Sequence, residues 1–460
     1  MYFQQKNPSA KLILIITTLS AFMTAFMGSA LNIALPIIGK DFNASALMLS
    51  WLSTIYLLTT AALLLPAGKL MDIYGRTKFF KYGVILFTLG SLLCGIAPNS
   101  IILLLLRIIQ GAGSAFIFSS STAILVSAYP VSSRGKALGI NTAAVYTGLS
   151  SGPFLGGLIT YYWNWRGIFF ITVLIGIVLI ILTYIYLKQE FHELSKQKYD
   201  YSGAGIYIFS IILLMIGISL FPGLIGFVLL VISVVIFILF YFYELRVNDP
   251  IFSASLFKEN RTFTFSNLAA LINYSATFAI GFLMSFYLQS VKGLTSQNAG
   301  LILMTQPIMQ ALFSPLAGKL SDKTEPQIVA SIGMGLLTIG LIVFCFINPG
   351  TSLTLIITNL AMLGLGFALF SSPNVNAIMS SVEKTHYGVA SSTLASMRMI
   401  GQMFSMGIVI IIFSIFIGGA KINTANQMAF LTSARYAFIL FSLLSFLGIF
   451  ASISRGKIHK

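Results

Sequence analysis

The hydrophobic positions of this chain are gathered into long apolar runs, and short segments that hold most of the charged residues separate them. A helix needs about 20 apolar residues to cross the hydrocarbon core of a bilayer, and the runs reach that length. The pattern predicts an all-α polytopic membrane protein with fourteen transmembrane helices. The predicted spans lie at about 12–34, 46–67, 79–97, 101–126, 137–160, 167–187, 203–220, 223–243, 264–289, 297–318, 327–347, 352–379, 388–418 and 431–453.

A short motif occurs twice along this pattern. The sequence PAGKLMD (Pro66–Asp72) follows the second run, and PLAGKLSD (Pro315–Asp322) follows the tenth. Equivalent loops of two tandem six-helix halves would be six spans apart, whereas these are eight apart, so two spans are inserted between the halves. We expect an N-terminal six-helix bundle at 1–187, a cytoplasmic loop with two inserted helices at 188–245, and a C-terminal six-helix bundle at 246–460. Internal repeats of this kind are typical of secondary transporters.

Composition supports the same fold class. The chain has 460 residues, of which 57% are hydrophobic and 8% charged, whereas a soluble domain carries roughly 25% charged residues. Its net charge of +16 could suggest nucleic acid, but no basic block is present. With both termini cytoplasmic, 20 of the 27 Lys and Arg residues fall on the inner side, five on the outer side and two within spans. This bias is the one that the positive-inside rule requires, so we expect no nucleic-acid partner.

The segments between the spans are too short for a catalytic domain. The longest, near 188–202 and 244–263, contain no nucleophile–base pair, metal-ligand spacing or phosphate-binding loop. We therefore expect no enzyme activity, no cofactor, no metal site and no ATP drive. Cys94 and Cys345 lie in or near apolar runs, and we expect both to be free thiols.

Three sequence motifs, in this order, resemble those of the major facilitator superfamily. The loop GKLMDIYGRTK after the second run is similar to the signature G-x-L-x-D-x-x-G-R-[KR], with Thr77 as a departure. LRIIQGAGSA (Leu106–Ala115) resembles the fourth-span motif, and GLSSGPFLGG (Gly148–Gly157) resembles the antiporter motif of the fifth span. With its fourteen predicted spans and these motifs, the chain resembles the fourteen-span drug:proton antiporter branch of this superfamily.

The resemblance implies a gate in the loop after the second span and in its second copy. A charge-paired loop that closes one face of the molecule is a gate, and glycines permit its tight turn. An ordinary basic loop is the alternative reading. The candidate gating residues are Gly68, Asp72, Gly75, Arg76, Lys78, Gly318 and Asp322.

The fourth and fifth spans carry the candidate transport and coupling residues. An arginine within a span is costly and indicates function, although Arg107 could also extend toward the outer interface. Glycines four residues apart share one helix face and permit close packing, with or without a directional role. The candidates are Arg107, Gln110, Gly148, Gly152, Pro153 and Gly156.

Polar side chains within other spans are candidates for substrate binding. For each of them an interhelical hydrogen bond is at least as good an explanation. The candidates are Asn32, Asn141, Tyr146, Asn273, Gln289, Asn374 and Arg398.

No acidic residue lies within a predicted span. All eleven Asp and Glu residues fall in loops or at span ends. Relatives in the resembling branch often carry an Asp in the first span, and Met27 stands at that position here. Proton coupling would then require Asp72, Asp322 or another acid at a span end, such as Asp41 or Glu244. With Arg107 and Arg398 as the only buried charges, the cavity would favour neutral, zwitterionic or anionic solutes.

The sequence thus favours a secondary active transporter of the cell (inner) membrane that works by alternating access. The main prediction is proton-coupled efflux of drugs or amphipathic small molecules. The alternative is an uptake or exchange carrier for a nutrient or vitamin-like solute in the same fold, and a receptor or scaffold without transport is a third. The expected partners are a small-molecule substrate, the lipid bilayer and protons as the candidate coupling ion, with a monomeric chain.

Overall fold

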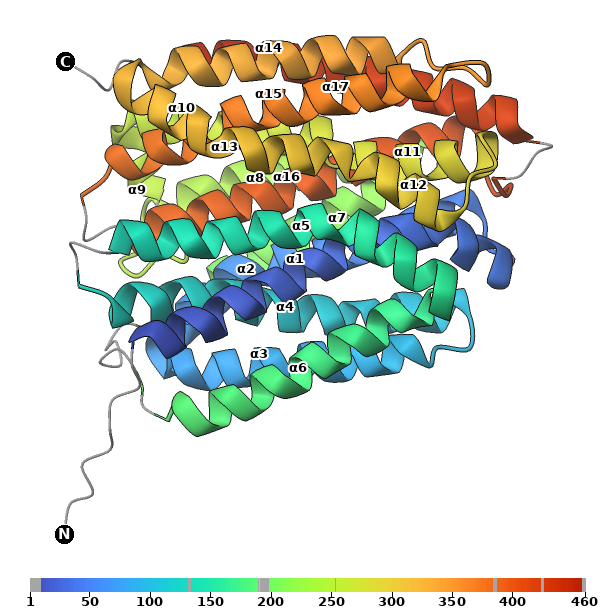
Figure 1. Ribbon diagram of the computed structural model, residues 1–460. Coiled ribbons are helices and arrows are strands. Elements are labelled where there is room, and N and C mark those ends of the chain that lie inside the picture. Colours follow the sequence, from blue (N-terminus) through green and yellow to red (C-terminus); the bar gives the residue numbers. More distant parts are fainter. Residues whose placement is uncertain are drawn as a thin grey trace.

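The computed structural model describes residues 10–130, 134–188, 190, 198–252, 254–383, 387–422 and 426–456. These ranges fold into helices and contain no strand (Figure 1). The helices are α1 (Ala10–Asp41), α2 (Ala46–Tyr74), α3 (Arg76–Gly95), α4 (Ser100–Ala128), α5 (Arg134–Trp163), α6 (Arg166–Tyr186), α7 (Tyr201–Leu220), α8 (Leu224–Glu244), α9 (Ala254–Glu259), α10 (Arg261–Thr277), α11 (Ala279–Phe286), the π-helix η1 (Tyr287–Val291), α12 (Ser296–Leu303), α13 (Thr305–Lys323), α14 (Pro326–Phe344), α15 (Leu353–Ser380), α16 (Tyr387–Phe416) and α17 (Gln427–Ile453).

Thirteen helical segments within the described ranges are long and apolar enough to cross a membrane. The polytopic all-helical fold is thereby confirmed. The other expected span corresponds to α5, which is not among the thirteen because glycine, serine and threonine replace much of its apolar sequence. It nevertheless runs along α1 through the length of the molecule (Figure 1). The count of fourteen stays a prediction.

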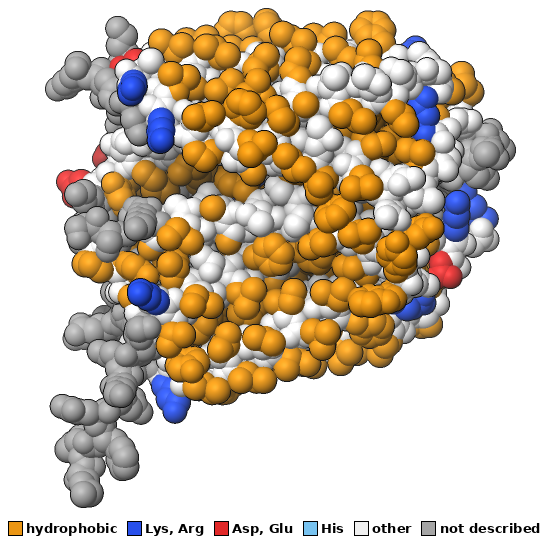
Figure 2. Space-filling view, in the orientation of Figure 1, with side chains coloured by type: hydrophobic (Ala, Val, Ile, Leu, Met, Phe, Trp, Pro, Cys, Tyr) orange, Lys and Arg blue, Asp and Glu red, His pale blue; other side chains and the backbone are white. Residues whose placement is uncertain are grey.

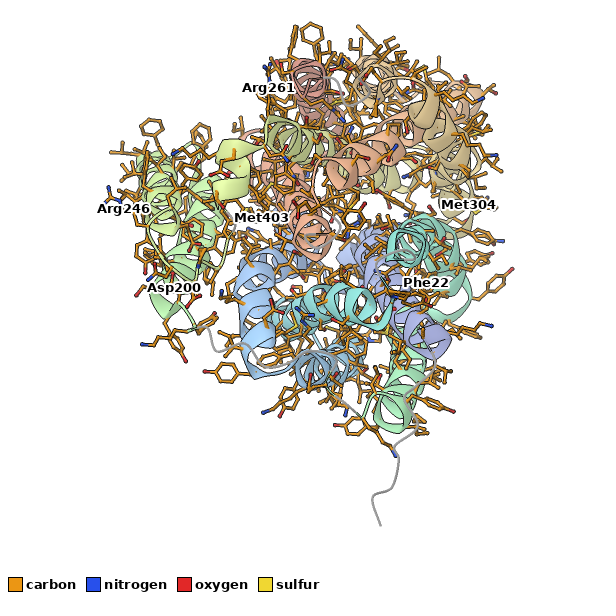
Figure 3. All side chains as sticks on the ribbon, turned by 90° about the vertical axis from the view of Figure 1, so that its left-hand side faces the viewer. Phe22, Asp200, Arg246, Arg261, Met304 and Met403 are labelled. Carbon is orange, nitrogen blue, oxygen red and sulfur yellow. The ribbon has the colours of Figure 1, made fainter. Side chains whose placement is uncertain are left out.

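Helix contacts gather into two groups. Helices α1–α6 pack mainly against one another and form what we name the N-terminal half, whereas α10–α17 form the C-terminal half. The inserted pair, α7 and α8, stands beside both halves (Figure 3). The division of the chain into these parts at 187 and 245 remains our proposal.

The outer surface matches a bilayer environment. Hydrophobic side chains cover the flank of the helices, and Lys and Arg gather at the two ends (Figure 2). Because α1 begins and α17 ends at the same end, the chain returns to the side where it started (Figure 1). We name this end, which carries the α2–α3 loop, the gate end, and we name the opposite one the far end.

Two of the predicted continuous spans are interrupted in the structure. Between α10 and α11, the amide N–H of Ala279 donates to Ser405 Oγ of α16 at 3.0 Å. Between α12 and α13, the helix is broken at Met304. Pro307 follows this break and cannot donate to the carbonyl group of Leu303. Irregular backbone at membrane depth is tolerated where it borders a cavity.

Helix α7 contacts both halves. The Tyr207 hydroxyl donates to the carbonyl oxygen of Ala61 at 3.0 Å, and Trp51 Nε1 donates to Ser219 Oγ at 3.1 Å, so α7 is hydrogen-bonded to α2. Its other side reaches α16, where a Cβ on Gly407 would lie 3.1 Å from Ile218. The inserted pair therefore occupies a flank of the seam between the halves.

Candidate transport site

A cavity of about 120 Å³ lies between the two halves. Both interruptions described above border it, through Phe278 on one side and Leu303 and Pro307 on the other. The Tyr146 and Tyr274 hydroxyls are hydrogen-bonded across the seam at 3.0 Å, one from each half. The cavity is lined by Ser29, Asn32, Ile33, Tyr146, Leu149, Ser150, Pro153, Tyr274, Thr277, Phe278, Gly281, Leu303, Gln306, Pro307, Gln310, Phe367 and Gln402. Aromatic and aliphatic walls with a few amides suit an amphipathic solute.

Three predicted residues line this cavity. Asn32 and Tyr146 stand among the predicted substrate contacts, and Pro153 belongs to the glycine-rich motif. Asn32 Oδ1 accepts a hydrogen bond from Ser53 Oγ at 2.9 Å, which leaves its NH2 group for a solute. These three residues lie on α1 and α5, which form one wall of the cavity.

Arg398 lies next to the cavity. Its side chain is 8% exposed, and its Nε has no hydrogen-bond partner. The guanidinium carbon is 5.7 Å from the centre of the Phe118 ring, and the group lies beside Tyr274. It borders a small void that also touches Gln402. A buried cation with an open donor attracts an electron-rich group of a solute.

The other predicted contacts lie elsewhere. Asn141, Asn273 and Asn374 are buried, and each has at least one unpaired side-chain polar atom, but none of them lines the cavity. Gln289 Nε2 donates to the carbonyl oxygen of Ile33 at 2.9 Å and so bridges the halves. Its geometry is that of an interhelical hydrogen bond, which was the alternative reading.

Gln310 and Gln402 line the cavity, but the sequence analysis did not single them out. Helical spacing could have revealed both. Gln402 lies four residues after Arg398, and Gln310 lies four residues after Gln306, so each shares a helix face with a polar neighbour.

Arg107 is buried within the N-terminal half and does not line the central cavity. Its Nη1 donates to Gln110 Oε1 at 2.5 Å, and its Nε donates to the carbonyl oxygen of Leu52 at 3.3 Å. The guanidinium carbon stands 4.4 Å from the centre of the Tyr56 ring. Gln110 in turn donates to Ser91 Oγ at 2.7 Å. This network ties α4 to α2 and α3.

The glycine motif of α5 packs against α1. A Cβ on Gly148 would stand 2.5 Å from the carbonyl oxygen of Phe22, and one on Gly152 would collide with Ser29 Oγ. A Cβ on Gly156 would lie 3.0 Å from the carbonyl oxygen of Ala30. Close helix approach is the structural role that glycine every four residues predicts.

The same helix continues the close contact into the C-terminal half. A Cβ on Gly157 would lie 2.5 Å from the carbonyl oxygen of Ser296, and one on Gly300 would collide with the carbonyl oxygen of Pro153. Ser296 Oγ donates to the carbonyl oxygen of Gly157 at 3.2 Å. The motif therefore forms a seam between the halves near the far end.

The α2–α3 loop forms a charge-paired turn. Arg76 and Asp72 form an ion pair at 2.7 Å, and Arg76 Nη1 donates to Ser127 Oγ of α4 at 2.8 Å. The carboxylate of Glu190 accepts from the amide N–H groups of Thr77 and Lys78, each at 3.0 Å. Glu190 therefore caps the N-terminus of α3, a role that the sequence analysis missed.

Gly75 joins α2 to α3 with φ = +114° and faces the Glu190 carboxylate. We expect Gly75→Ala to lower the free energy of unfolding by about 1–3 kcal/mol, the usual cost of this backbone region for a residue with a Cβ. Gly68 is the matched control, because a Cβ on it would meet no atom within 4 Å. Thermal unfolding of the purified protein checks the prediction, and equal melting temperatures for the Gly75→Ala and Gly68→Ala variants would contradict it.

The second copy of the loop motif lies at the end of α13. Gly318 approaches α15, since a Cβ on it would stand 3.0 Å from Ser372 Oγ. Ser321 Oγ accepts from Asn376 Nδ2 at 3.2 Å. The Asp322 side chain lies outside the described part of the structure, so its gating role stays a prediction.

The two ends of the molecule differ. A second cavity of about 560 Å³ lies at the gate end, between α2 and α4 on one side and α16 and residues 250–252 on the other. At the far end the halves meet directly, since the Ala46 amide N–H donates to the carbonyl oxygen of Ala420 at 3.0 Å. The Gly157–Ser296 and Gln289–Ile33 contacts join them as well. This is the arrangement of an alternating-access protein closed at its far end.

The expectation that Arg107 and Arg398 are the only buried charges is wrong. Glu244 at the end of α8 is 2% exposed, and Arg455 beyond α17 is fully buried. The error arose because a position at a span end was equated with exposure, whereas here neighbouring segments cover both residues. A buried acid therefore exists in this chain.

The family model of the Major Facilitator Superfamily matches residues 17–258 and 266–456. The chain is 32% identical over 387 residues to the riboflavin transporter RibZ of Clostridioides difficile (strain 630), covering 84% of each protein. It is 30% identical over 409 residues to the multidrug resistance protein Stp of Mycobacterium tuberculosis (strain CDC 1551 / Oshkosh), covering 87% of this chain and 75% of that protein.

A solved structure has the same fold. It is a bacterial homologue of the human lysosomal transporter Spinster in an inward-facing and unoccupied conformation, with a TM-score of 0.68, 16% identity and 97% of both chains covered. The resemblance carried by the three motifs is confirmed. This multi-pass membrane protein belongs to the Major Facilitator Superfamily of transporters.

Proposed function

We propose that the chain exports drugs or other amphipathic small molecules across the inner membrane in exchange for protons, by alternating access. The halves rock about the seam formed by α1, α5 and α12, and the central cavity opens to each side in turn. We expect the transporter to act as a monomer. We also propose that the gating residues, the glycine seam of α5 and the residues that line the central cavity have the roles that these names describe.

The central cavity is the observation that supports this proposal most directly. Its walls combine aromatic rings from both halves with neutral amides, and no carboxylate is among its lining residues. Such a surface binds molecules with a large apolar face and a few polar groups. Aromatic side chains contribute large apolar contact areas, which suits the binding of amphipathic compounds.

Membrane orientation follows from the basic residues. The gate end carries the α2–α3 loop and both described chain ends, and the sequence assigns 20 of the 27 basic residues to this side. Basic loops are retained in the cytoplasm. We therefore place the gate end and both termini in the cytoplasm, so the 560 Å³ cavity faces inward.

Uptake or exchange of a vitamin-like solute is the second candidate. Met27 replaces the acid that the resembling branch often carries, and its sulfur accepts from Thr172 Oγ1 at 3.7 Å inside the N-terminal half. A site without a counter-ion suits a neutral polar ring system better than a multivalent cation. One relative is named as a riboflavin transporter, which makes riboflavin a suitable probe.

Transport in everted membrane vesicles separates the two candidates. Efflux predicts that ethidium or a similar amphipathic dye partly collapses a preset pH gradient, and that overexpression raises resistance to it. The uptake candidate predicts riboflavin-dependent growth of a riboflavin auxotroph that expresses the chain, with no such collapse. A chain that moves neither probe nor protons would contradict both.

Arg398, next to the central cavity, offers a test of solute charge. We expect Arg398→Gln to weaken the apparent affinity for the anionic dye fluorescein roughly 10- to 100-fold, since hydrogen bonds to charged groups contribute about 1.5–3 kcal/mol. Ethidium transport should be unchanged or improved, because a buried positive charge has been removed. The exposed Arg246 at the end of α8 is the matched control (Figure 3). Equal losses for both dyes would show that Arg398 does not select by charge.

A further inference from the structure

Two carboxylates meet in the inserted pair, at the gate end and away from the central cavity. Glu244 ends α8 and is 2% exposed. Half-buried Asp200 precedes α7 and is labelled in Figure 3. Glu244 Oε1 and Asp200 Oδ2 both lie against the α-carbon of Gly203, in the space that a side chain would fill. Both oxygens are buried and have no hydrogen-bond partner.

The remaining oxygens of this pair have partners. Asp200 Oδ1 accepts from the Gly203 amide N–H at 2.9 Å and from the Tyr243 hydroxyl at 3.0 Å. Glu244 Oε2 accepts from the Phe252 amide N–H at 2.9 Å. The two unpaired oxygens are therefore neighbours beside Gly203, and two negative charges so placed repel strongly in a buried environment. A proton held between them removes the repulsion and supplies the missing hydrogen bond.

Lys69 of α2 is the charged group that faces Glu244 from the N-terminal half, and its attraction favours the ionised form. Tyr243 faces the pair from α8, and backbone N–H groups face it from residues 251–252. Within the part of the chain that the structure describes, Lys69 is the cation that acts on Glu244, against two acids. Asp200 is the more exposed member and is the entry point for a proton.

We propose that Asp200 and Glu244 form the binding site of the coupling proton in this transporter. This inference rests on the proposed exchange of solute for protons and names the residues that perform it. When a proton arrives, one carboxylate becomes a carboxyl group whose O–H donates to the oxygen of the other. When it leaves, both are ionised again, and the site is ready for the next proton.

The proton is linked to the solute path through Phe252. The segment formed by Pro250, Ile251 and Phe252 lines the gate-end cavity together with Lys69 and Asp72. A hydrogen bond to an ionised group is roughly twice as strong as one to a neutral group. Protonation of Glu244 therefore loosens the bond that holds Phe252, and deprotonation tightens it.

The Phe252 ring continues this link into the C-terminal half. It stands 4.9 Å from the Phe257 ring of α9, which stands 5.2 Å from the Phe263 ring of α10. A change in the strength of the Glu244–Phe252 hydrogen bond is transmitted along these rings to α10, which contains Tyr274 of the central cavity. The inserted pair is thereby a functional part of the transporter.

Proton binding is tested first without transport, by infrared difference spectroscopy of the purified full chain after a pH step across neutrality. We expect the wild type to show the carbonyl band of a protonated carboxyl group that is lost at the higher pH. Glu244→Gln should abolish this band, and Asp200→Asn should abolish or shift it. The exposed Glu259→Gln is the matched control and should retain it. A band of unchanged intensity in Glu244→Gln overturns the proposal.

Coupling is tested in proteoliposomes with ethidium, fluorescein and riboflavin as probes. We expect Glu244→Gln to reduce accumulation driven by a pH gradient at least tenfold more than it reduces exchange at equal pH, whereas Glu259→Gln reduces neither. Equal reduction of both reactions contradicts a coupling role, as does accumulation in the wild type that follows a sodium gradient instead. A wild type that transports no probe contradicts the proposed function, and the infrared result then still decides proton binding.

Discussion

Gly300→Ala is expected to open the far end of the transporter. In the structure, an added Cβ would meet the carbonyl oxygen of Pro153, which lies in the rigid backbone of α5 and belongs to the other half. Overpacking of this kind costs about 1–3 kcal/mol. The cost falls only on the state in which the halves touch here, so the ratio of the open to the closed far end should rise about 5- to 150-fold.

A cysteine at Ser150, which lines the central cavity, reports this change when Cys94 and Cys345 have been replaced by alanine. A membrane-impermeant maleimide added from the far side should label Ser150→Cys faster in the presence of Gly300→Ala. Gly335 is the matched control, because a Cβ on it would meet nothing within 4 Å. Equal labelling rates with Gly300→Ala and Gly335→Ala would contradict the proposed seam.

Arg107→Ala is expected to reduce transport at least about tenfold, equivalent to about 1.4 kcal/mol. The substitution releases the carbonyl group of Leu52 and leaves the amide oxygen of Gln110 without its donor. Leu52 precedes Ser53, which holds Asn32 in the central cavity. Because truncation of a large buried side chain costs about 3–5 kcal/mol, the melting temperature should fall as well.

Arg455→Ala separates stability from transport. This arginine is as deeply buried and donates to the carbonyl oxygen of Ser452 at 2.8 Å, but it lies beyond α17 and does not line the central cavity. We expect a similar fall in melting temperature with transport largely retained. If initial transport rates, normalised to protein in the membrane, were equal in the two variants, Arg107 would have no role beyond packing.

Much of the fold could be read from the sequence because a bilayer leaves few choices to an apolar run of 20 residues. Helix interruptions were harder to foresee. Pro307 is a visible signal for the break at Met304, but the break near Phe278 depends on Ser405, which is 126 residues away from Ala279. The span at 137–160 was predicted as one of the long apolar runs, although the apolar content of α5 is low.

The site was only partly predictable for a similar reason. A polar residue within a span is visible in the sequence, but its direction is not, so Asn32 and Tyr146 reach the cavity whereas Asn273 and Asn374 do not. Glu244 was noted as an acid at a span end. Its burial depends on the residues that fold over it and on Asp200, which lies 44 positions earlier, and no local pattern records that proximity.

The contacts of α7 decide which half this helix follows during the transport cycle. Tyr207 and Trp51 join it to α2 by directional bonds, whereas Ile218 and Met215 approach Gly407 of α16 by apolar contact. Hydrogen bonds resist the sliding of one helix past another, whereas an apolar contact permits it. We therefore expect α7 to move with α2 while α16 slides past it, so that the lipid around its exposed face is displaced together with the N-terminal half.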